Sequence, residues 1–339
     1  MIRSSMNIAT NRNRILWIDY TKGICMIAVM MNHLGWPLEY ARLMYPFELA
    51  GFFFVAGYTF NRKKTSIEFI KSKIMSLLIP IMILGTINAI IAYIAESKPL
   101  FDRLVGLAVQ MPGAWDDLWF VACLFTMELV FYVFTNDSFS IRKIGMLCFT
   151  ASLASSFWIS SVGLRLPWHI ENACLLLPFM FAGYFMKHNT LPARLSKGVI
   201  GMMAICLLLS FYSVFVFVYP NYPIDVHLLE YGNLFVFFIS ASLGVGFLTI
   251  FTVFLDKSSL RFAPLIFIGQ NTLIYYAFQS KAIRLFDIVG NLINCDRTSY
   301  LGNIIGMLFV SFVLVVPAFI VNRYFPFILG RFSNRKFIN

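Results

Sequence analysis

The sequence is poor in charged residues. Only 13% of its 339 residues are charged, whereas about 25% is usual in soluble domains. Hydrophobic residues make up 59% of the chain, and the mean hydropathy is +0.77. The length alone would suit two soluble domains, but this composition and the repeated long apolar runs are typical of a membrane protein with several spans.

Several patterns that would indicate other chemistry are missing. The six cysteines include no CxxC pair, five of them lie within apolar runs, and no His/Cys cluster has the spacing of metal ligands. This argues against a disulfide framework and a structural zinc site, so we expect no metal. No GxSxG sequence is present, so we do not expect a serine acyl-enzyme of the hydrolase type.

Ten apolar segments are long enough to cross a bilayer, for which about 17–25 residues are needed. Short loops connect them, which predicts an all-α, polytopic membrane domain of about ten helices over residues 15–322. Residues 1–14 are polar and basic, and residues 323–339 form a basic tail. The first segment has no small-residue cleavage site after it, so we expect a retained helix and not a signal peptide. The segments are approximately 15–35, 43–60, 74–95, 117–135, 143–162, 171–187, 198–219, 232–255, 263–286 and 302–322.

Basic residues are unevenly distributed among the loops. With the N-terminus in the cytoplasm, the cytoplasmic segments contain 19 of the 27 Lys and Arg residues. This is the positive-inside pattern of membrane proteins. It predicts that both termini are cytoplasmic; the membrane we expect for the protein is the inner membrane of a bacterium. The net charge of +11 is then a topology signal, and nucleic-acid binding is not expected.

The first apolar segment contains three polar residues that are costly inside a bilayer. Lys22 and His33 are eleven residues apart, which on a helix is about 20° in azimuth and about 16 Å in depth. Asp19 falls on the same side, about 40° from His33. The three side chains should form one stripe that faces the bundle interior or a wet cavity. The alternative is an interfacial Asp19–Lys22 ion pair and a histidine that only packs.

The sequence of this stripe, IDYTKGICMIAVMMNH at 18–33, resembles the first-helix signature of the membrane acyltransferase-3 superfamily. In that signature ten residues separate a basic residue from a histidine, and Lys22 and His33 fit it. The lysine with a preceding aspartate resembles the fucose 4-O-acetylase-like branch. Five later elements resemble the family's in the right order: GFFFVAGYTF (51–60), FIKSKIMSLLIP (69–80), LWFVACLF (118–125), LPFMFAGYFMK (177–187) and IGQNTLIYYAFQ (268–279).

The resemblance covers nearly the whole chain and implies an integral membrane enzyme. Such an enzyme takes an acyl group, usually acetyl, from cytoplasmic acyl-CoA and delivers it to a hydroxyl of a glycan or another envelope component. Three positions depart from the family's pattern. Glu48 and Gln279 stand where histidine is frequent, and Ser76 stands where a second basic residue follows Lys73.

Acyl transfer to a hydroxyl requires a base for the alcohol proton and a donor for the oxyanion. His33 is the only histidine within the interior of a predicted span, and imidazole suits the base at neutral pH, so we predict His33 as the general base. We predict that Glu48, at a similar depth, orients His33. The alternative for Glu48 is a carboxylate that is hydrogen-bonded for structure alone. Gln279 is predicted to donate to the oxyanion near His33.

The phosphates of coenzyme A require cations and amide donors on the cytoplasmic side. We predict that Asp19 holds Lys22 in place for this purpose. Ordinary positive-inside charge is the alternative for the two lysines of the third segment, and helix capping is the alternative for Asn271. The predicted donor-binding residues are Asp19, Lys22, Lys71, Lys73 and Asn271.

Four further polar residues have weaker signals. Glu128, inside the fourth segment, is expected to pair with a cation. His169 and Glu171 lie where an acceptor sugar could meet the outer mouth, and His227 is expected to be solvated in an outer loop.

Two other functions remain open from the sequence. A transporter or flippase for an envelope glycan or small molecule would also have charges within its spans, although the inverted repeats frequent in transporters are not evident. An inactive membrane partner in envelope assembly would explain the three departures from the family's pattern. The predicted partners are a glycan acceptor and the lipid bilayer, and the oligomeric state is not predicted.

Overall fold

The computed structural model describes residues 15–35, 38–62, 65–112, 118–135, 139–163, 165–189, 196–217, 225–258, 261–293 and 295–330. This part of the chain is helical, and its only extended pairing is an isolated bridge between Asp225 and Glu230. The helices are α1 Leu16–His33, α2 Leu38–Thr59, α3 Ser66–Lys73, η1 Ile74–Leu78, α4 Ile79–Glu96, α5 Leu100–Val109, α6 Trp119–Phe134, α7 Ile141–Ser161, η2 Pro167–His169, α8 Ile170–Leu175, α9 Leu177–Asn189, α11 Lys197–Phe217, α12 Leu234–Lys257, α13 Ala263–Gln270, α14 Thr272–Leu292, α15 Tyr300–Val313, α16 Val315–Tyr324 and η4 Pro326–Leu329.

Five helical stretches of the described chain are long and apolar enough to cross a membrane, as expected for a membrane protein. The helix α1 is not among them, because its polar residues lower its hydropathy. The number of spans and the side on which the termini lie stay predictions. The five stretches are Ser66–Glu96, Ile141–Ser161, Lys197–Val214, Leu234–Lys257 and Tyr300–Tyr324, with Trp119–Phe134 as a shorter apolar helix.

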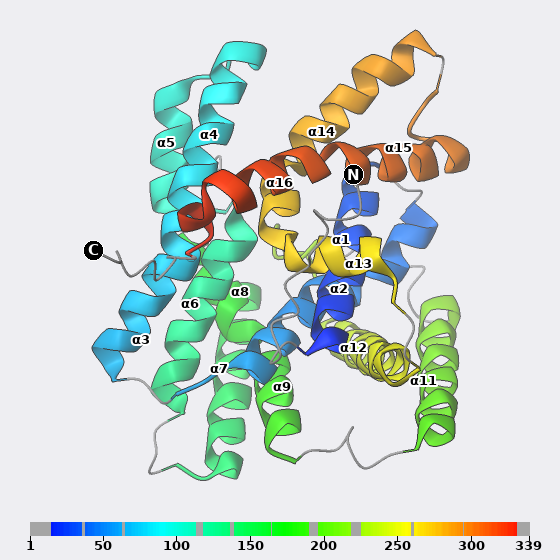
Figure 1. Cartoon of the computed structure of the whole chain (residues 1–339). Helices are drawn as coiled ribbons and strands as arrows, with labels where there is room; N and C mark the ends of the chain where they lie inside the picture. The colour runs from blue at the N-terminus through cyan, green and yellow to red at the C-terminus, as the bar shows by residue number, and fades with distance from the viewer. Residues whose placement is uncertain are drawn as a thin grey trace, which may run out of the picture.

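Other helices surround the polar helix α1. It packs against α2, α12, α13, α14 and α15 (Figure 1). Most of its residues from Trp17 to Met30 are buried, and they include Asp19. A helix with polar groups is stable in a membrane when protein and not lipid covers it. The predicted interior position of the first helix is therefore confirmed.

Three predicted segments are not single helices. The segment 263–286 is divided at Asn271 into α13 and α14, the segment 171–187 contains the break between α8 and α9, and α15 is separated from α16 at Leu314. At the first break, the side chain of Asn322 donates to Asn271 Oδ1 at 2.6 Å. Interrupted helices are tolerated at membrane depth where neighbouring groups satisfy the backbone or a cavity lies beside it. Periodicity could not locate these breaks, because the flanking residues are equally apolar.

The third predicted segment begins earlier and is less regular than expected. Thr65 and Glu68 form a capping box that begins α3. The helix then passes through the π-helical turn η1 before α4. Such turns are frequent at functional sites. The turn is also where the described part of the predicted tail packs, since a Cβ at Gly330 would lie 2.5 Å from the carbonyl oxygen of Met75.

Glycines set two close helix crossings. A Cβ atom at Gly269 in α13 would lie 1.8 Å from the carbonyl oxygen of Asp19 in α1. A Cβ at Gly57 in α2 would lie 1.8 Å from the carbonyl oxygen of Met180 in α9. Small residues let membrane helices approach until their backbones touch. The first crossing fixes α13 beside the buried carboxylate of Asp19.

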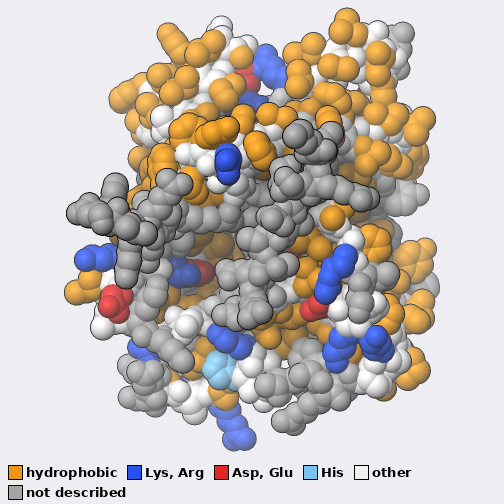
Figure 2. Space-filling view, in the orientation of Figure 1, with side chains coloured by type: hydrophobic (Ala, Val, Ile, Leu, Met, Phe, Trp, Pro, Cys, Tyr) orange, Lys and Arg blue, Asp and Glu red, His pale blue; other side chains and the backbone are white. Residues whose placement is uncertain are grey.

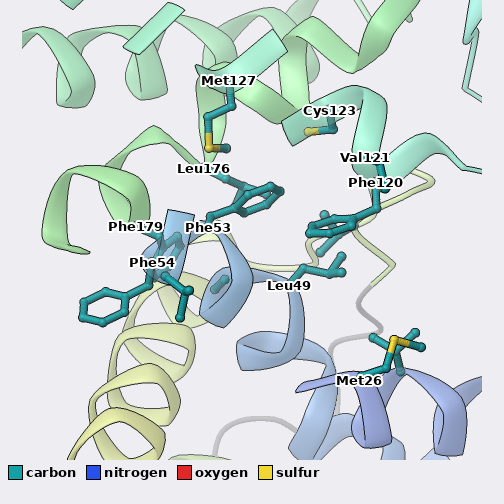
Figure 3. Close-up of a cluster of buried hydrophobic side chains, with 14 of the residues drawn as sticks. Met26, Leu49, Phe53, Phe54, Phe120, Val121, Cys123, Met127, Leu176 and Phe179 are labelled. Carbon is teal, nitrogen blue, oxygen red and sulfur yellow. The ribbon is translucent and has the colours of Figure 1, made fainter. Parts of the chain in front are cut away.

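The hydrophobic core lies among α1, α2, α6 and the α8–α9 pair (Figure 3). Phe53 of α2 is fully buried, and its ring centroid lies 5.2 Å from that of Phe120 in α6. Figure 3 shows Met127 and Leu176 on the other side of Phe53. This core holds α2 and α6 against α1, and so it forms the walls of the cavities described below.

The outer helices expose large hydrophobic side chains. Leu153 of α7 is 71% exposed and Phe312 of α15 is 77% exposed. Figure 2 shows that hydrophobic side chains dominate the upper half of the face it presents. Extended apolar surface of this kind is expected where a protein meets lipid.

Candidate functional site

One cavity begins beside Lys22 and runs along α1. We call it the Lys22 cavity; its volume is 290 Å³. Its polar wall contains Lys22, Ser76 of η1, Glu128 of α6 and Thr272 at the start of α14. The remaining wall is mostly apolar. The π-helical turn and the break at Asn271 therefore both lie beside this cavity.

A second cavity, the His33 cavity, surrounds the end of α1 and has a volume of 200 Å³. It shares four lining residues with the Lys22 cavity, and so the two adjoin along α1. The shared residues are Val29, Leu49, Phe120 and Tyr276. The polar lining of the His33 cavity consists of Asn32, His33, Tyr45, Glu48, Trp119, Asp225, His227 and Tyr276.

His33 is the last residue of α1, and its side chain is exposed to these cavities. It lines the His33 cavity and also a third, strongly basic cavity. Two of the three residues of the predicted stripe, Lys22 and His33, therefore border adjoining cavities. Asp19 instead points into the contact between α1 and α13, where it accepts from Gln270 Nε2 at 3.0 Å.

Glu48 contacts the helix end beside His33. Its Oε2 accepts from Asn32 Nδ2 at 2.7 Å, and the residue is 5% exposed. Within the described chain no hydrogen bond joins Glu48 to His33 itself. The carboxylate therefore holds the residue that precedes His33, and the predicted orienting role would act through α1 and not through a direct contact.

Of the three predicted donor-binding lysines, two lie at or next to the Lys22 cavity and the third lies on the surface of α3. Lys22 lies 3.9 Å from Asp19, with 28% of its side chain exposed, and it lines the Lys22 cavity. Lys73 forms an ion pair with Glu128, whose side chain lines that cavity, which confirms the expected cationic partner of Glu128. Lys71 is exposed on α3 and lines none of the three cavities.

Asn271 has a structural position between α13 and α14. Its Nδ2 donates to the carbonyl oxygen of Phe267 at 2.8 Å, and its Oδ1 accepts from Asn322. Asn271 does occupy the N-cap position of α14, as the capping alternative has it, but its side chain makes no cap bond to that helix. It brings Thr272 and Leu273 to the wall of the Lys22 cavity.

Gln279 is 4% exposed on α14 and lines none of the three cavities. Its role as an oxyanion donor stays a prediction. Tyr276, about one turn earlier, lines both the Lys22 and the His33 cavities, and its hydroxyl accepts from the Phe120 backbone N–H at 3.3 Å. Sequence reasoning missed Tyr276, although it lies within the quoted motif IGQNTLIYYAFQ.

The sequence also misplaced two histidines. His227 lies in a turn, as predicted, but it is only partly exposed: it lines the His33 cavity and stacks on Trp119 with ring centroids 4.9 Å apart. His169 is fully buried, 5.2 Å from the Trp119 ring, and lines none of the three cavities. Both positions depend on how distant segments pack on α6, which neither periodicity nor charge counts reveal. Trp119 therefore joins a cavity wall to a buried histidine.

Charges lie at the two ends of this cavity system, and apolar side chains line the passage between them. A charged substrate group could therefore stay at one end while an uncharged arm extends toward the other. Among the described residues no group of three or more His, Cys, Asp or Glu side chains could hold a metal ion. The polar groups that line the two cavities are an ammonium, two imidazoles, carboxyl groups, and hydroxyl or amide groups.

Comparisons with known proteins agree with this architecture. A family model described as an acyltransferase domain, acyltransferase-3, matches residues 15–323. The chain is also 23% identical over 347 residues to nodulation protein NolL of Mesorhizobium japonicum, an alignment that covers 93% of this chain and 89% of the relative. No solved structure matches the chain. Since the family match extends over almost the entire described region and includes both α1 and the α13–α14 break, this chain belongs to the acyltransferase-3 family.

Proposed function

We propose that the protein is an O-acyltransferase of the inner membrane of a bacterium, with ten spans and both termini in the cytoplasm. It moves an acyl group, most simply acetyl, from cytoplasmic acyl-CoA to a hydroxyl of an envelope or exported glycan. The observation that supports this best is the pair of adjoining cavities along α1, which extend from Lys22 to His33. A thioester and an alcohol entering from opposite sides would meet at that junction.

The Lys22 cavity is the proposed entrance for acyl-CoA. Lys22 lines the cavity with 28% of its side chain exposed, so its ammonium can reach a phosphate there. Lys73 is already neutralised by Glu128, and its contribution is to fix η1 against α6. Exposed Lys71 adds positive charge outside the cavity. The apolar walls would exclude water from the thioester.

His33 is the proposed general base. Its imidazole takes the proton of the acceptor hydroxyl while the hydroxyl oxygen forms a bond to the thioester carbonyl carbon. The carbon–sulfur bond then breaks, and the departing thiolate of coenzyme A takes the proton from His33. The products are the glycan ester and coenzyme A, with His33 restored. The developing oxyanion requires a donor, for which Gln279 and the hydroxyl of Tyr276 are the two candidates.

Glu48 is a positioning residue in this scheme. Its bond to Asn32 fixes the last turn of α1, which carries His33. A base must lie within hydrogen-bond reach of the proton it removes, so a small rotation of that turn would reduce the rate.

Labelled acetyl-CoA and a polysaccharide acceptor, mixed with the full-length protein in lipid nanodiscs, test the proposal. We expect label in the glycan, and a decrease of about 100-fold or more in His33→Ala, because positioned general bases contribute about 10²–10⁴-fold. His188→Ala is the matched control, because His188 is exposed at the end of α9 and lines none of the three cavities.

Two outcomes would contradict the proposal. Glycan flux across a vesicle membrane without label transfer would favour the transporter or flippase. Neither transfer nor flux, in a protein that remains folded, would favour an inactive membrane partner.

A further inference from the structure

The third cavity that His33 borders is strongly basic. It has a volume of 450 Å³, and we call it the basic cavity. It lies between the ends of α4 and α14, where Figure 2 shows charged side chains together in a largely hydrophobic upper half. Its charged lining consists of five cations and two carboxylates, namely Lys98, Arg103, Lys281, Arg284, Arg297, Glu96 and Asp287.

The two carboxylates cannot neutralise this group. Three cations converge on Glu96: Lys98 Nζ at 2.8 Å, Lys281 Nζ at 3.0 Å and Arg284 Nη1 at 2.8 Å. The second carboxylate, Asp287, binds Arg297 Nε at 3.2 Å. Arg103, only 5% exposed, also lies in the wall. Low-dielectric walls focus such an excess of one sign into the cavity.

This concentration of charge runs against the bias of the chain. Nineteen of the 27 basic residues fall in the predicted cytoplasmic segments, which leaves eight. Five of those eight line the basic cavity. The positive-inside rule favours few cations outside the cytoplasmic segments, so it does not explain why five of them line one cavity.

We propose that the basic cavity binds an anionic group of the acceptor, a phosphoryl group or a carboxylate on the sugar, and so presents a neighbouring hydroxyl to His33. This inference rests on the proposed acyl transfer and specifies its acceptor class. Guanidinium groups bind phosphate and carboxylate oxygens through paired N–H donors, and Arg284 retains 48% of its side-chain surface beside Glu96. His33 lines both this cavity and the His33 cavity, and so a sugar held by its anion reaches the proposed base.

Binding without turnover tests the inference. The probes are N-acetylglucosamine 1-phosphate, glucuronate and neutral N-acetylglucosamine, titrated into the full-length protein in phosphatidylcholine nanodiscs. We expect the two anions to bind, more weakly at higher salt, and the neutral sugar not to bind at the same concentrations. Arg284→Gln should weaken anion binding about tenfold or more, equivalent to about 1.4 kcal/mol.

Arg261→Gln is the matched control. Arg261 also lies beside a carboxylate, at 3.7 Å from Asp256, and is 58% exposed, but it does not line the basic cavity. It should bind the anionic probes as the unaltered protein does. Arg297→Gln provides a second cavity variant if Arg284→Gln does not fold, and it should also weaken binding.

Each of the following results would overturn the inference: equal binding of neutral and anionic sugars, unchanged binding in a folded cavity variant, or an increased KM for acetyl-CoA in that variant with unchanged sugar binding. The last would assign the cavity to the phosphates of the donor. Loss of probe binding in phosphatidylglycerol nanodiscs would assign it to lipid headgroups, and this also contradicts an acceptor site. Probe binding is measured without acyl transfer, so the two proposals can fail separately. Absence of probe binding with label transfer intact would contradict only the anion site, and absence of label transfer with probe binding intact would contradict only the proposed acyl transfer.

Discussion

The Lys22 cavity and the basic cavity, which border opposite ends of α1 and are called the two ends below, balance their charges differently. At one end, Lys22 lies beside Asp19 and Lys73 pairs with Glu128, so each lysine has its own carboxylate. At the other end, three cations share Glu96. A buried pair with matched charges mainly fixes the elements that carry it. An excess of cations, in contrast, keeps a net field that an anion can neutralise. The Lys73–Glu128 pair is thus suited to fixing the wall of the Lys22 cavity, while Lys22, with 28% of its side chain exposed, remains the proposed contact for the donor. The excess of cations around Glu96 is suited to binding an anion.

The largest expected contrast is in stability. Lys73→Gln leaves the carboxylate of Glu128 in a site where only 8% of its side chain is exposed, and we expect the free energy of unfolding to fall by about 3 kcal/mol. Lys281→Gln leaves Glu96 with two cations, so the decrease should stay below about 1 kcal/mol. Unfolding of the full chain in mixed micelles, followed by tryptophan fluorescence, measures both.

The double variant Lys73→Met/Glu128→Leu controls for the loss of the lysine side chain. It removes both charges and should recover most of the stability that Lys73→Gln loses. If Lys73→Gln and Lys281→Gln were equally destabilising, the distinction between a balanced and an excess cluster would be wrong.

A smaller loss of stability is expected from a change that displaces α13 beside the Lys22 cavity and leaves the basic cavity unchanged. In Gly269→Ala the new Cβ would clash with the carbonyl oxygen of Asp19, from which it would lie 1.8 Å, so α13 must shift. We expect a loss of about 2 kcal/mol in stability. The KM for acetyl-CoA should rise about threefold, by our estimate, because Gln270 of α13 holds Asp19 beside Lys22.

Gly201→Ala is the control for this change, because the nearest heavy atom to its added Cβ lies 3.8 Å away. Binding of N-acetylglucosamine 1-phosphate should stay unchanged in both variants. A loss of probe binding in Gly269→Ala would show that the two ends of the system are not independent.

The sequence predicted the elements of this site better than their connections. Eleven-residue spacing in one helix placed Lys22 and His33 beside the same cavity system, because helical geometry is local. The break at Asn271 was missed, because Asn322, fifty-one positions later, supports it. His227 was assigned to solvent, since nothing local indicates that it stacks on Trp119. The basic cavity was missed because its cations come from three separate parts of the chain: Lys98, Arg103 and Arg297 were counted as ordinary loop charges, and Lys281 and Arg284 lie within the predicted segment 263–286.

The smallest expected effect concerns the junction of the two ends. Glu48→Gln keeps an oxygen that can accept from Asn32 but replaces the other carboxyl oxygen with an amide nitrogen, which alters a hydrogen bond of the kind that contributes about 1 kcal/mol. We expect kcat to fall about tenfold, equivalent to about 1.4 kcal/mol in the barrier, with the KM for acetyl-CoA and the binding of N-acetylglucosamine 1-phosphate unchanged. Glu230→Gln, at an exposed carboxylate outside the cavity lining, should leave all three unchanged.

Comparing kcat with the KM for acetyl-CoA and with probe binding distinguishes a positioning role of Glu48 from a role in folding alone. If Glu48 only supported the fold, the folded fraction of Glu48→Gln would decrease while the kcat of the remaining folded protein stayed the same. A rise in the KM for acetyl-CoA would place Glu48 at the donor end, and weaker probe binding would place it at the acceptor end. A fall in kcat alone would mean that the carboxylate acts at the last turn of α1, where the two ends meet at His33.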